Sequence, residues 1–153
     1  MALDEFDLIA RYFRTERLQR AAASGAVALG IGDDAALLQP AAGQQLVIST
    51  DTLVEGVHFP VNCPPAELGY RALAVAVSDL AAMAAEPLGF TLALTLPQAE
   101  AGWLQAFSAG LGDAARDCRI NLIGGARVAA GRTLDVLNPA TGAVLAQAAA
   151  SDA

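Results

Sequence analysis

Apolar side chains recur at helical spacing in three stretches of the chain. Residues 4–20 carry them at i, i+3, i+4 and i+7, which is typical of an amphipathic helix. Residues 65–85 are rich in Ala, Leu and Val and begin with a proline, which is well tolerated in a first helical turn. Residues 99–118 repeat the helical spacing. The pattern therefore predicts three helices, of which the second and third are long.

Short apolar runs bounded by Gly, Pro, Asn or Asp predict the strands. Residues 35–38 and 45–52 flank a turn at 40–43, which favours an antiparallel hairpin. Residues 87–96 and 120–123 flank the third helix, so we expect a β-α-β unit with parallel strands and a right-handed crossover. The predicted fold class is α/β (α+β), a mixed sheet of about four to five strands packed by two long helices.

The chain changes character after residue 125. Residues 126–153 are rich in alanine and contain a strand, a turn and a second strand at most. We therefore expect an N-terminal α/β domain at 1–125 and a divergent tail at 126–153 that forms a short hairpin or is disordered.

Composition excludes several classes of function. The 153 residues carry a net charge of −7 with a pI near 4.4 and no basic cluster, which argues against nucleic acid as a partner. The N-terminus is acidic, and no apolar run approaches the ~20 residues of a membrane span, so we expect a cytoplasmic protein. Cys63 and Cys118 lack the spacing of a zinc site and are expected to be buried, reduced thiols.

Polar chemistry gathers where the predicted strand at 45–52 ends. Ser49, Thr50 and Asp51 follow the apolar run at 46–48, and His58, the single histidine, comes seven positions after Asp51. We expect a buried strand whose end carries two hydroxyls and a carboxylate. Gly56, between Asp51 and His58, gives this part of the backbone additional conformational freedom.

A further carboxylate lies inside the second predicted helix. Asp79 shares a helical stripe with Leu68, Ala72 and Val75, where an unpaired carboxylate is costly. It also opposes the helix dipole, since it comes near the C-terminal end. We therefore expect a cationic group to compensate its charge.

Close carboxylates require a counter-charge. Asp33, Asp34, Asp51 and Asp79 stand at predicted element ends or on the apolar stripe, and two carboxylates ~4 Å apart repel by about 4 kcal/mol at an effective dielectric near 20. A shared proton or a hard cation relieves that repulsion. Hydroxyl and carboxylate oxygens favour Mg²⁺ over softer metals, and Mg²⁺ commonly binds substrate phosphates. The residues thus predict a magnesium site that handles phosphate.

Each of these features also has a purely structural interpretation. The glycines and aspartates at 30–34 are typical of a plain turn, and Ser49-Thr50-Asp51 is typical of a cap. His58 can be an ordinary hydrogen-bonded side chain, and Gly124-Gly125 can be a turn after a strand. The residues alone leave the reaction open.

Several motifs in order resemble the N-terminal part of the thiamine-monophosphate kinase family. They cover the chain from about residue 3 to Gly125 and are Glu5-Phe6 to Arg11-Tyr12-Phe13, Gly30-Ile31-Gly32-Asp33-Asp34, Ile48 to His58-Phe59, Ala72-Leu73-Ala74-Val75 to Ser78-Asp79-Leu80-Ala81-Ala82-Met83, Leu92 to Pro97, and Leu122-Ile123-Gly124-Gly125. That family uses ATP to phosphorylate thiamine monophosphate. It shares a superfamily with aminoimidazole ribonucleotide synthetase, whose N-terminal halves pair across a dimer.

The resemblance implies roles for individual residues. It implies Mg²⁺ ligands at Asp34, Ser49, Thr50, Asp51 and Asp79, with Asp33 as a further candidate. It also implies that Gly124 and Gly125 approach ATP, that His58 contacts thiamine monophosphate, and that the chain forms a homodimer through this domain.

The sequence departs from the family pattern after Gly125. The family continues with an aspartate that binds metal, whereas this chain has Ala126, and the family's second α/β domain has no counterpart here. Residues 134–146 instead resemble the N-terminal strand segment of aldehyde dehydrogenases. We therefore expect a truncated or fused kinase with impaired activity. The alternatives are a non-catalytic dimerising or ligand-binding module, or another kinase or synthetase of the same superfamily.

Overall fold

The structure is a computed structural model of the 153-residue chain. It describes residues 5–19, 26–31, 35–124, 132–137 and 144–150, the last two ranges as backbone. The elements, in chain order, are α1 (Glu5–Leu8), the π-helix η1 (Ile9–Phe13), β1 (Val27–Leu29), β2 (Leu37–Leu38), α2 (Pro65–Ala82), β3 (Gly89–Phe90), α3 (Ala101–Cys118), β4 (Asn121–Leu122), β5 (Arg132–Leu137) and β6 (Val144–Ala150).

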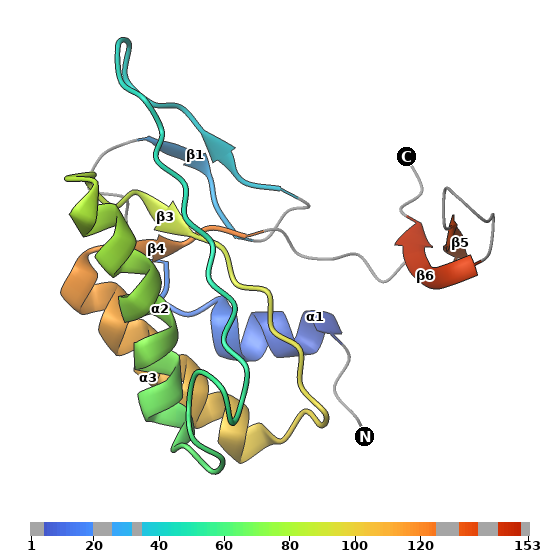
Figure 1. The fold of residues 1–153 in the computed structure, drawn as a ribbon. Coiled ribbons are helices and arrows are strands. Elements are labelled where there is room, and N and C mark those ends of the chain that lie inside the picture. The colour runs from blue at the N-terminus through green and yellow to red at the C-terminus, as the bar shows by residue number, and fades with distance from the viewer. Residues whose placement is uncertain (1–4, 20–25, 32–34, 125–131, 138–143, 151–153) are drawn as a thin grey trace.

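The two long helices, α2 and α3, pack side by side and organise the fold (Figure 1). Pro65 is the first residue of α2, where its missing N–H costs no helical hydrogen bond. Arg119 caps α3 in the left-handed conformation, and its N–H bonds back to the carbonyls of the last turn. Both helices confirm the sequence prediction to within three residues.

Glycine permits the close approach of these helices. A Cβ at Gly69 of α2 would meet the Phe107 carbonyl oxygen of α3, and a Cβ at Gly110 of α3 would meet the Ala66 carbonyl. Backbone therefore touches backbone at this crossing, which no other residue type allows without moving a helix.

The first predicted helix is shorter than expected. Helical structure ends at Phe13, and a turn bonded to Thr15 follows, in which the N–H groups of Leu18 and Gln19 both donate to the Thr15 carbonyl. The helix ends early because Tyr12, Phe13 and Leu18 are all buried, and a turn is needed to bring Leu18 into the core.

One apolar core lies between η1, the two long helices and β4. Its buried side chains come from these elements and from the turns next to them: Tyr12, Phe13, Leu18, Leu68, Leu73, Leu104, Phe107, Leu111, Ala114, Ala115, Ile120 and Leu122. Burial of such side chains contributes ~25 cal/mol for each Å² removed from water. The core therefore holds the helical layer together.

The β-α-β unit is present. Gly89 and Phe90 of β3 pair in parallel with Asn121 and Leu122 of β4, with α3 between them in the chain. The parallel pairing confirms the prediction, although β3 has two residues instead of the ten-residue strand expected at 87–96.

The predicted hairpin is wrong. Leu37 and Leu38 pair antiparallel with β1 and not with residues 45–52, and the Gln39 N–H donates to the Ala26 carbonyl in the same ladder. Residues 45–52 run as a long, drawn-out segment and belong to no strand (Figure 1). In the described ranges, the strands form three two-stranded sheets and not one sheet of four or five.

The strands β5 and β6 pair with each other as an antiparallel hairpin. Ala126 lies outside the described residues. Among the helices that the structure describes, none is long and apolar enough to cross a bilayer.

Candidate functional site

A hydrogen bond joins two segments that are thirty positions apart in the sequence. The Ser49 Oγ donates to Asp79 Oδ2 over 2.9 Å. Ser49 lies in the extended segment 45–54, and Asp79 lies in the last turn of α2. The fold thus brings together two of the residues that the sequence assigns to the metal site.

The surroundings of Asp79 differ from the sequence prediction. Leu68 is buried against α3, but Val75 and Asp79, further along the predicted stripe, are exposed. The reason is that the helix buries the face of Leu68 and Leu73 and turns the Asp79 face toward residues 45–54. Within the described residues, Asp79 accepts a hydrogen bond from the Ser49 hydroxyl, and the compensating cation stays a prediction.

Thr50 and Asp51 follow Ser49 along the rim of a large cavity of about 1130 Å³. The segments 45–55 and 88–98 form one side of it, and α2 and α3 contribute apolar side chains such as Leu73 and Phe107. Thr50 and Asp51 are both exposed. The cavity therefore has an apolar interior and an oxygen-rich edge.

The segment that carries these oxygens is less buried than predicted. Ile48 is 83% exposed, and Leu46 and Val47 are exposed as well. A strand becomes buried only when neighbours cover its edges and faces, and this segment pairs with no strand in the described residues. The expectation of a buried strand at 45–52 is therefore wrong for this chain.

The metal site itself stays a prediction. Among the described residues, no group of three or more His, Cys, Asp or Glu side chains could hold an ion. Asp33 and Asp34 lie outside those residues. The donors that do meet, the Ser49 hydroxyl and the Asp79 carboxylate, are hard oxygen ligands of the kind that suits Mg²⁺.

His58 lies in a tight loop held by its own hydrogen bonds. Its Nδ1 accepts the Val54 N–H at 3.0 Å, which places the ring proton on Nε2. The Gly56 N–H donates to the Phe59 carbonyl, and Glu55 Oε1 accepts the Asn62 N–H at 3.3 Å. The sequence analysis missed the structural role of Glu55. The neighbouring glycine could have indicated the turn, in which Gly56 adopts a φ of 76°.

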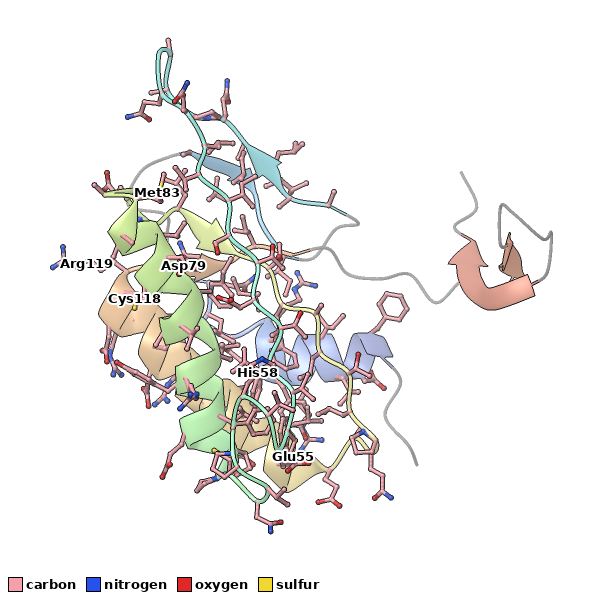
Figure 2. The ribbon with its side chains drawn as sticks, in the orientation of Figure 1. Glu55, His58, Asp79, Met83, Cys118 and Arg119 are labelled. Atoms are coloured by element: carbon pink, nitrogen blue, oxygen red, sulfur yellow. The ribbon has the colours of Figure 1, made fainter. Side chains whose placement is uncertain are left out.

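His58 and Asp79 lie at different levels along α2 (Figure 2). Asp79 is near the C-terminal end of the helix, close to Met83, whereas His58 and Glu55 are toward the other end. The histidine therefore stands apart from the Ser49 and Asp79 pair along the same extended segment.

Gly124 lies two residues after the end of β4, and a Cβ built on it would meet none of the described atoms within 4 Å. Its backbone is therefore open to the close approach of a ligand. Gly125 lies outside the described residues. The two cysteines are free, but both are half-buried where full burial was expected. Burial, followed by the charge of Asp117, raises the pKa of the Cys118 thiol.

Comparison with known proteins places this chain in a family. The model of the N-terminal domain of AIR synthase related proteins matches residues 32–144. The thiamine-monophosphate kinase of Escherichia coli strain K12 is 54% identical over 125 residues, which cover 82% of this chain and 37% of the relative. That of Bacillus subtilis is 38% identical over 128 residues, 80% of this chain and 37% of the relative.

A solved structure gives the same result. The crystal structure of thiamine-monophosphate kinase from Stenotrophomonas maltophilia matches with a TM-score of 0.65 and 51% identity, over 82% of this chain and 38% of that one. The chain thus spans little more than a third of the length of these relatives. It belongs to the AIR synthase related proteins, as a form of their N-terminal domain similar to that of thiamine-monophosphate kinases.

Proposed function

We propose that this chain carries the magnesium- and phosphate-binding part of an enzyme that phosphorylates thiamine monophosphate with ATP. The observation that supports it most is the Ser49 to Asp79 hydrogen bond, which joins a hydroxyl from the lining of the large cavity to a carboxylate of α2, both hard oxygen donors. The names of the relatives supply the substrate class.

The metal ligands in this proposal are Ser49, Thr50, Asp51 and Asp79, with Asp34 and, as a further candidate, Asp33 from the preceding loop. Bound Mg²⁺ would neutralise charge on phosphate oxygens. Ser49 orients the Asp79 carboxylate through its hydroxyl, so the pair presents its remaining oxygens in a fixed direction. This reduces the entropy lost when a ligand binds.

The remaining roles follow from backbone and ring geometry. Gly124, whose Cβ position is open, would admit the nucleotide close to the main chain after β4, and the family resemblance extends this role to Gly125. His58, with Nδ1 occupied by the Val54 N–H, has its Nε2 proton available for an oxygen of thiamine monophosphate. In the transfer, an oxygen of that phosphate attacks the γ-phosphorus of ATP, the bond to the β–γ bridging oxygen breaks, and ADP leaves.

The 153-residue chain alone is proposed to bind nucleotide weakly and to turn over little. It spans 37% of the Escherichia coli relative, and phosphoryl transfer depends on groups placed around the whole phosphate chain.

A second candidate is a non-catalytic module that dimerises or binds ligand. The exposed apolar side chains of Ile48, Val57 and Val61 favour it, because a second copy could cover them. Another kinase or synthetase of the superfamily is less favoured, since the relatives compared above are all thiamine-monophosphate kinases.

Product analysis tests the proposal. The purified chain is incubated with ATP, Mg²⁺ and thiamine monophosphate, and ADP and thiamine diphosphate are quantified by chromatography. We expect slow formation of both products in equal amounts, reduced at least tenfold in Asp79→Asn and unchanged in Glu67→Gln, a matched carboxylate on the same helix. Product formation that is indifferent to Asp79 would contradict the assigned site. No product, with no magnesium-dependent ATP binding, would favour the non-catalytic module.

A further inference from the structure

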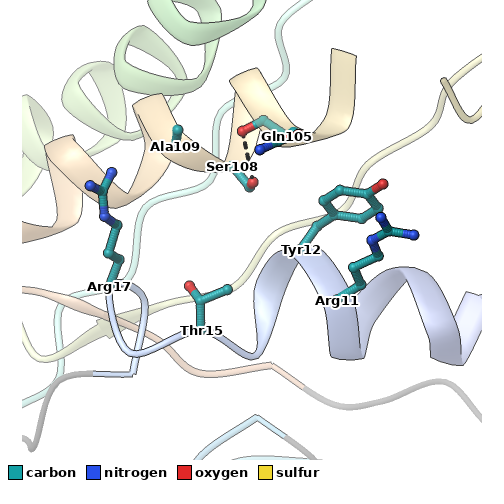
Figure 3. A pocket seen from close by; sticks show the side chains of 7 residues that line it. All are labelled: Arg11, Tyr12, Thr15, Arg17, Gln105, Ser108 and Ala109. Atoms are coloured by element: carbon teal, nitrogen blue, oxygen red, sulfur yellow. Dashed lines mark hydrogen bonds between the residues drawn. The ribbon is translucent and has the colours of Figure 1, made fainter. Parts of the chain in front are cut away.

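A second cavity lies between the end of η1 and one face of α3 (Figure 3). It has a volume of about 280 Å³ and shares no lining residue with the large cavity. Its walls combine cationic, hydroxyl, amide and phenol groups and include no carboxylate: Arg11, Tyr12, Thr15, Arg17, Gln105, Ser108 and Ala109. Two arginines around one small cavity are notable in a chain with a net charge of −7.

Arg11 contacts an aromatic ring and, among the described residues, makes no hydrogen bond through its N–H groups. Its guanidinium carbon lies 5.5 Å from the centroid of the Tyr12 ring, a cation–π contact. Tyr12 is only 5% exposed, so the ring is a fixed platform. This contact leaves the N–H groups of the guanidinium for another acceptor.

Arg17 is also positioned with donors to spare. Its aliphatic stem lies against Gly112 of α3, where a Cβ would come within 3.1 Å of the Arg17 Cβ. Its Nη1 is 3.8 Å from Asp113 Oδ1, which is too long for a hydrogen bond. That carboxylate oxygen is contacted at 2.8 Å by Arg116 instead. The Asp113 charge is thus shared, and the Arg17 guanidinium can accept a stronger anionic partner.

The two arginines stand at opposite ends of the cavity in Figure 3, with Thr15 and Tyr12 between them. Thr15 contributes a hydroxyl and Gln105 an amide, and the Ser108 hydroxyl already donates to the Gln105 carbonyl at 3.2 Å. The arrangement offers strong anion recognition at both ends and neutral hydrogen bonds in the middle.

We propose that this cavity binds a small metabolite with two separated phosphoryl groups, of the size of a sugar bisphosphate. The planar guanidinium fork matches phosphate oxygens better than a point charge does. The volume is at the lower end of that of ligand pockets, which limits the ligand to a small molecule. The cavity is thus a phosphate-recognition site separate from the Ser49 and Asp79 pair.

Calorimetric titration of the full chain tests the proposal with fructose 1,6-bisphosphate, glucose 6-phosphate and adipate as probes. Two-ended recognition predicts that the bisphosphate binds at least tenfold more tightly than the monophosphate, and more tightly than the dicarboxylate. Equal affinity for the two phosphates would overturn two-ended recognition. Adipate binding as tightly as the bisphosphate would overturn the phosphoryl assignment, and no heat at 10 mM bisphosphate would overturn the site.

Variants locate the binding. Arg11→Gln and Arg17→Gln should each weaken bisphosphate binding roughly tenfold, the loss expected for one charge-assisted group. Arg14→Gln is the matched control, because this exposed residue stands between the two arginines in sequence but does not line the cavity. An equal loss of affinity in Arg14→Gln would show that only the overall charge matters, and it would overturn the site. Circular dichroism verifies that each variant is folded, as expected for exposed side chains.

Discussion

At the residue scale, Asp79 occupies a position that local energetics disfavour. It is an acidic residue near the C-terminal end of α2, where the helix dipole is negative, and it is not paired with a cation that the structure describes. A residue that opposes its own helix is expected where function requires it. The Ser49 hydroxyl offsets part of this cost.

Replacing Asp79 by Asn should therefore stabilise the metal-free protein. Asn keeps an oxygen that can accept the Ser49 hydrogen bond while it removes the charge, so we expect the free energy of unfolding to rise by about 0.3–0.5 kcal/mol. Glu67→Gln, in the first turn of the same helix, should lower it by a similar amount. Urea denaturation without divalent ions measures both; a loss of stability in Asp79→Asn would show that the carboxylate is structural.

Tyr70 gives a second prediction at this scale. Its hydroxyl donates to Asp117 Oδ2 at 3.3 Å, and the negative charge of Asp117, together with this hydrogen bond, raises the Tyr70 pKa. A raised pKa in the folded protein means that the stabilisation is complete below the ordinary tyrosine pKa of about 10 and is lost as the pH rises through the folded value.

We expect Asp117→Asn to lower the Tyr70 pKa toward its ordinary value. Absorbance of tyrosinate at 295 nm follows the titration, and Tyr70→Phe identifies which of the two tyrosines is responsible. If the Tyr70 pKa were the same in Asp117→Asn as in the wild type, Asp117 would not be the group that raises it.

At the element scale, the contact between α2 and α3 depends on backbone proximity at Gly69 and Gly110. This contact fixes where Asp79 and the cavity wall stand relative to the core. The helices therefore act as the rigid support of the candidate site.

Gly110→Ala should destabilise the chain by about 1–3 kcal/mol, because its Cβ would overlap the Ala66 carbonyl and force the helices apart. Gly102→Ala is the matched control. It lies on the same helix with open space around it and should be neutral or stabilising by up to about 1 kcal/mol. Thermal denaturation compares the two, and equal effects would contradict the close helix contact.

Elements that depend on neighbouring residues could be predicted from the sequence, whereas those that depend on distant segments could not. Periodicity predicted α2 and α3, since each helix bonds within itself, and the β-α-β order predicted the parallel pair β3 and β4. The partner strand of β2 and the exposure of Ile48 could not be predicted from the sequence, because strand pairing depends on distant segments. The meeting of Ser49 with Asp79 was anticipated from residue type and resemblance, not from spacing.

At the scale of the whole molecule, apolar surface remains uncovered along the segment that carries the candidate ligands. Ile48 is 83% and Val57 74% exposed. A homodimer, which the family resemblance implies for this domain, could cover such residues. Burying these side chains at an interface would remove apolar surface from water, which favours association.

Ile48→Lys should therefore shift the chain toward monomer. Desolvating a charge at the interface is costly, so the dissociation constant of the dimer should rise at least tenfold. Phe6→Lys, which adds the same charge on α1 at a less exposed apolar position, should leave it unchanged. Analytical ultracentrifugation measures both. A wild-type chain that stays monomeric at high micromolar concentration would contradict the dimer.

The central claim is that Ser49 and Asp79 belong to a site for a divalent cation and phosphate. Titration of Mn²⁺ in the presence of ATP, followed by electron paramagnetic resonance, measures this directly, because free and protein-bound Mn²⁺ differ in signal. We predict binding of the Mn²⁺–nucleotide complex that weakens at least tenfold in Asp79→Asn and is unchanged in Glu67→Gln. Equal binding by all three proteins, or none by the wild type, would contradict the account.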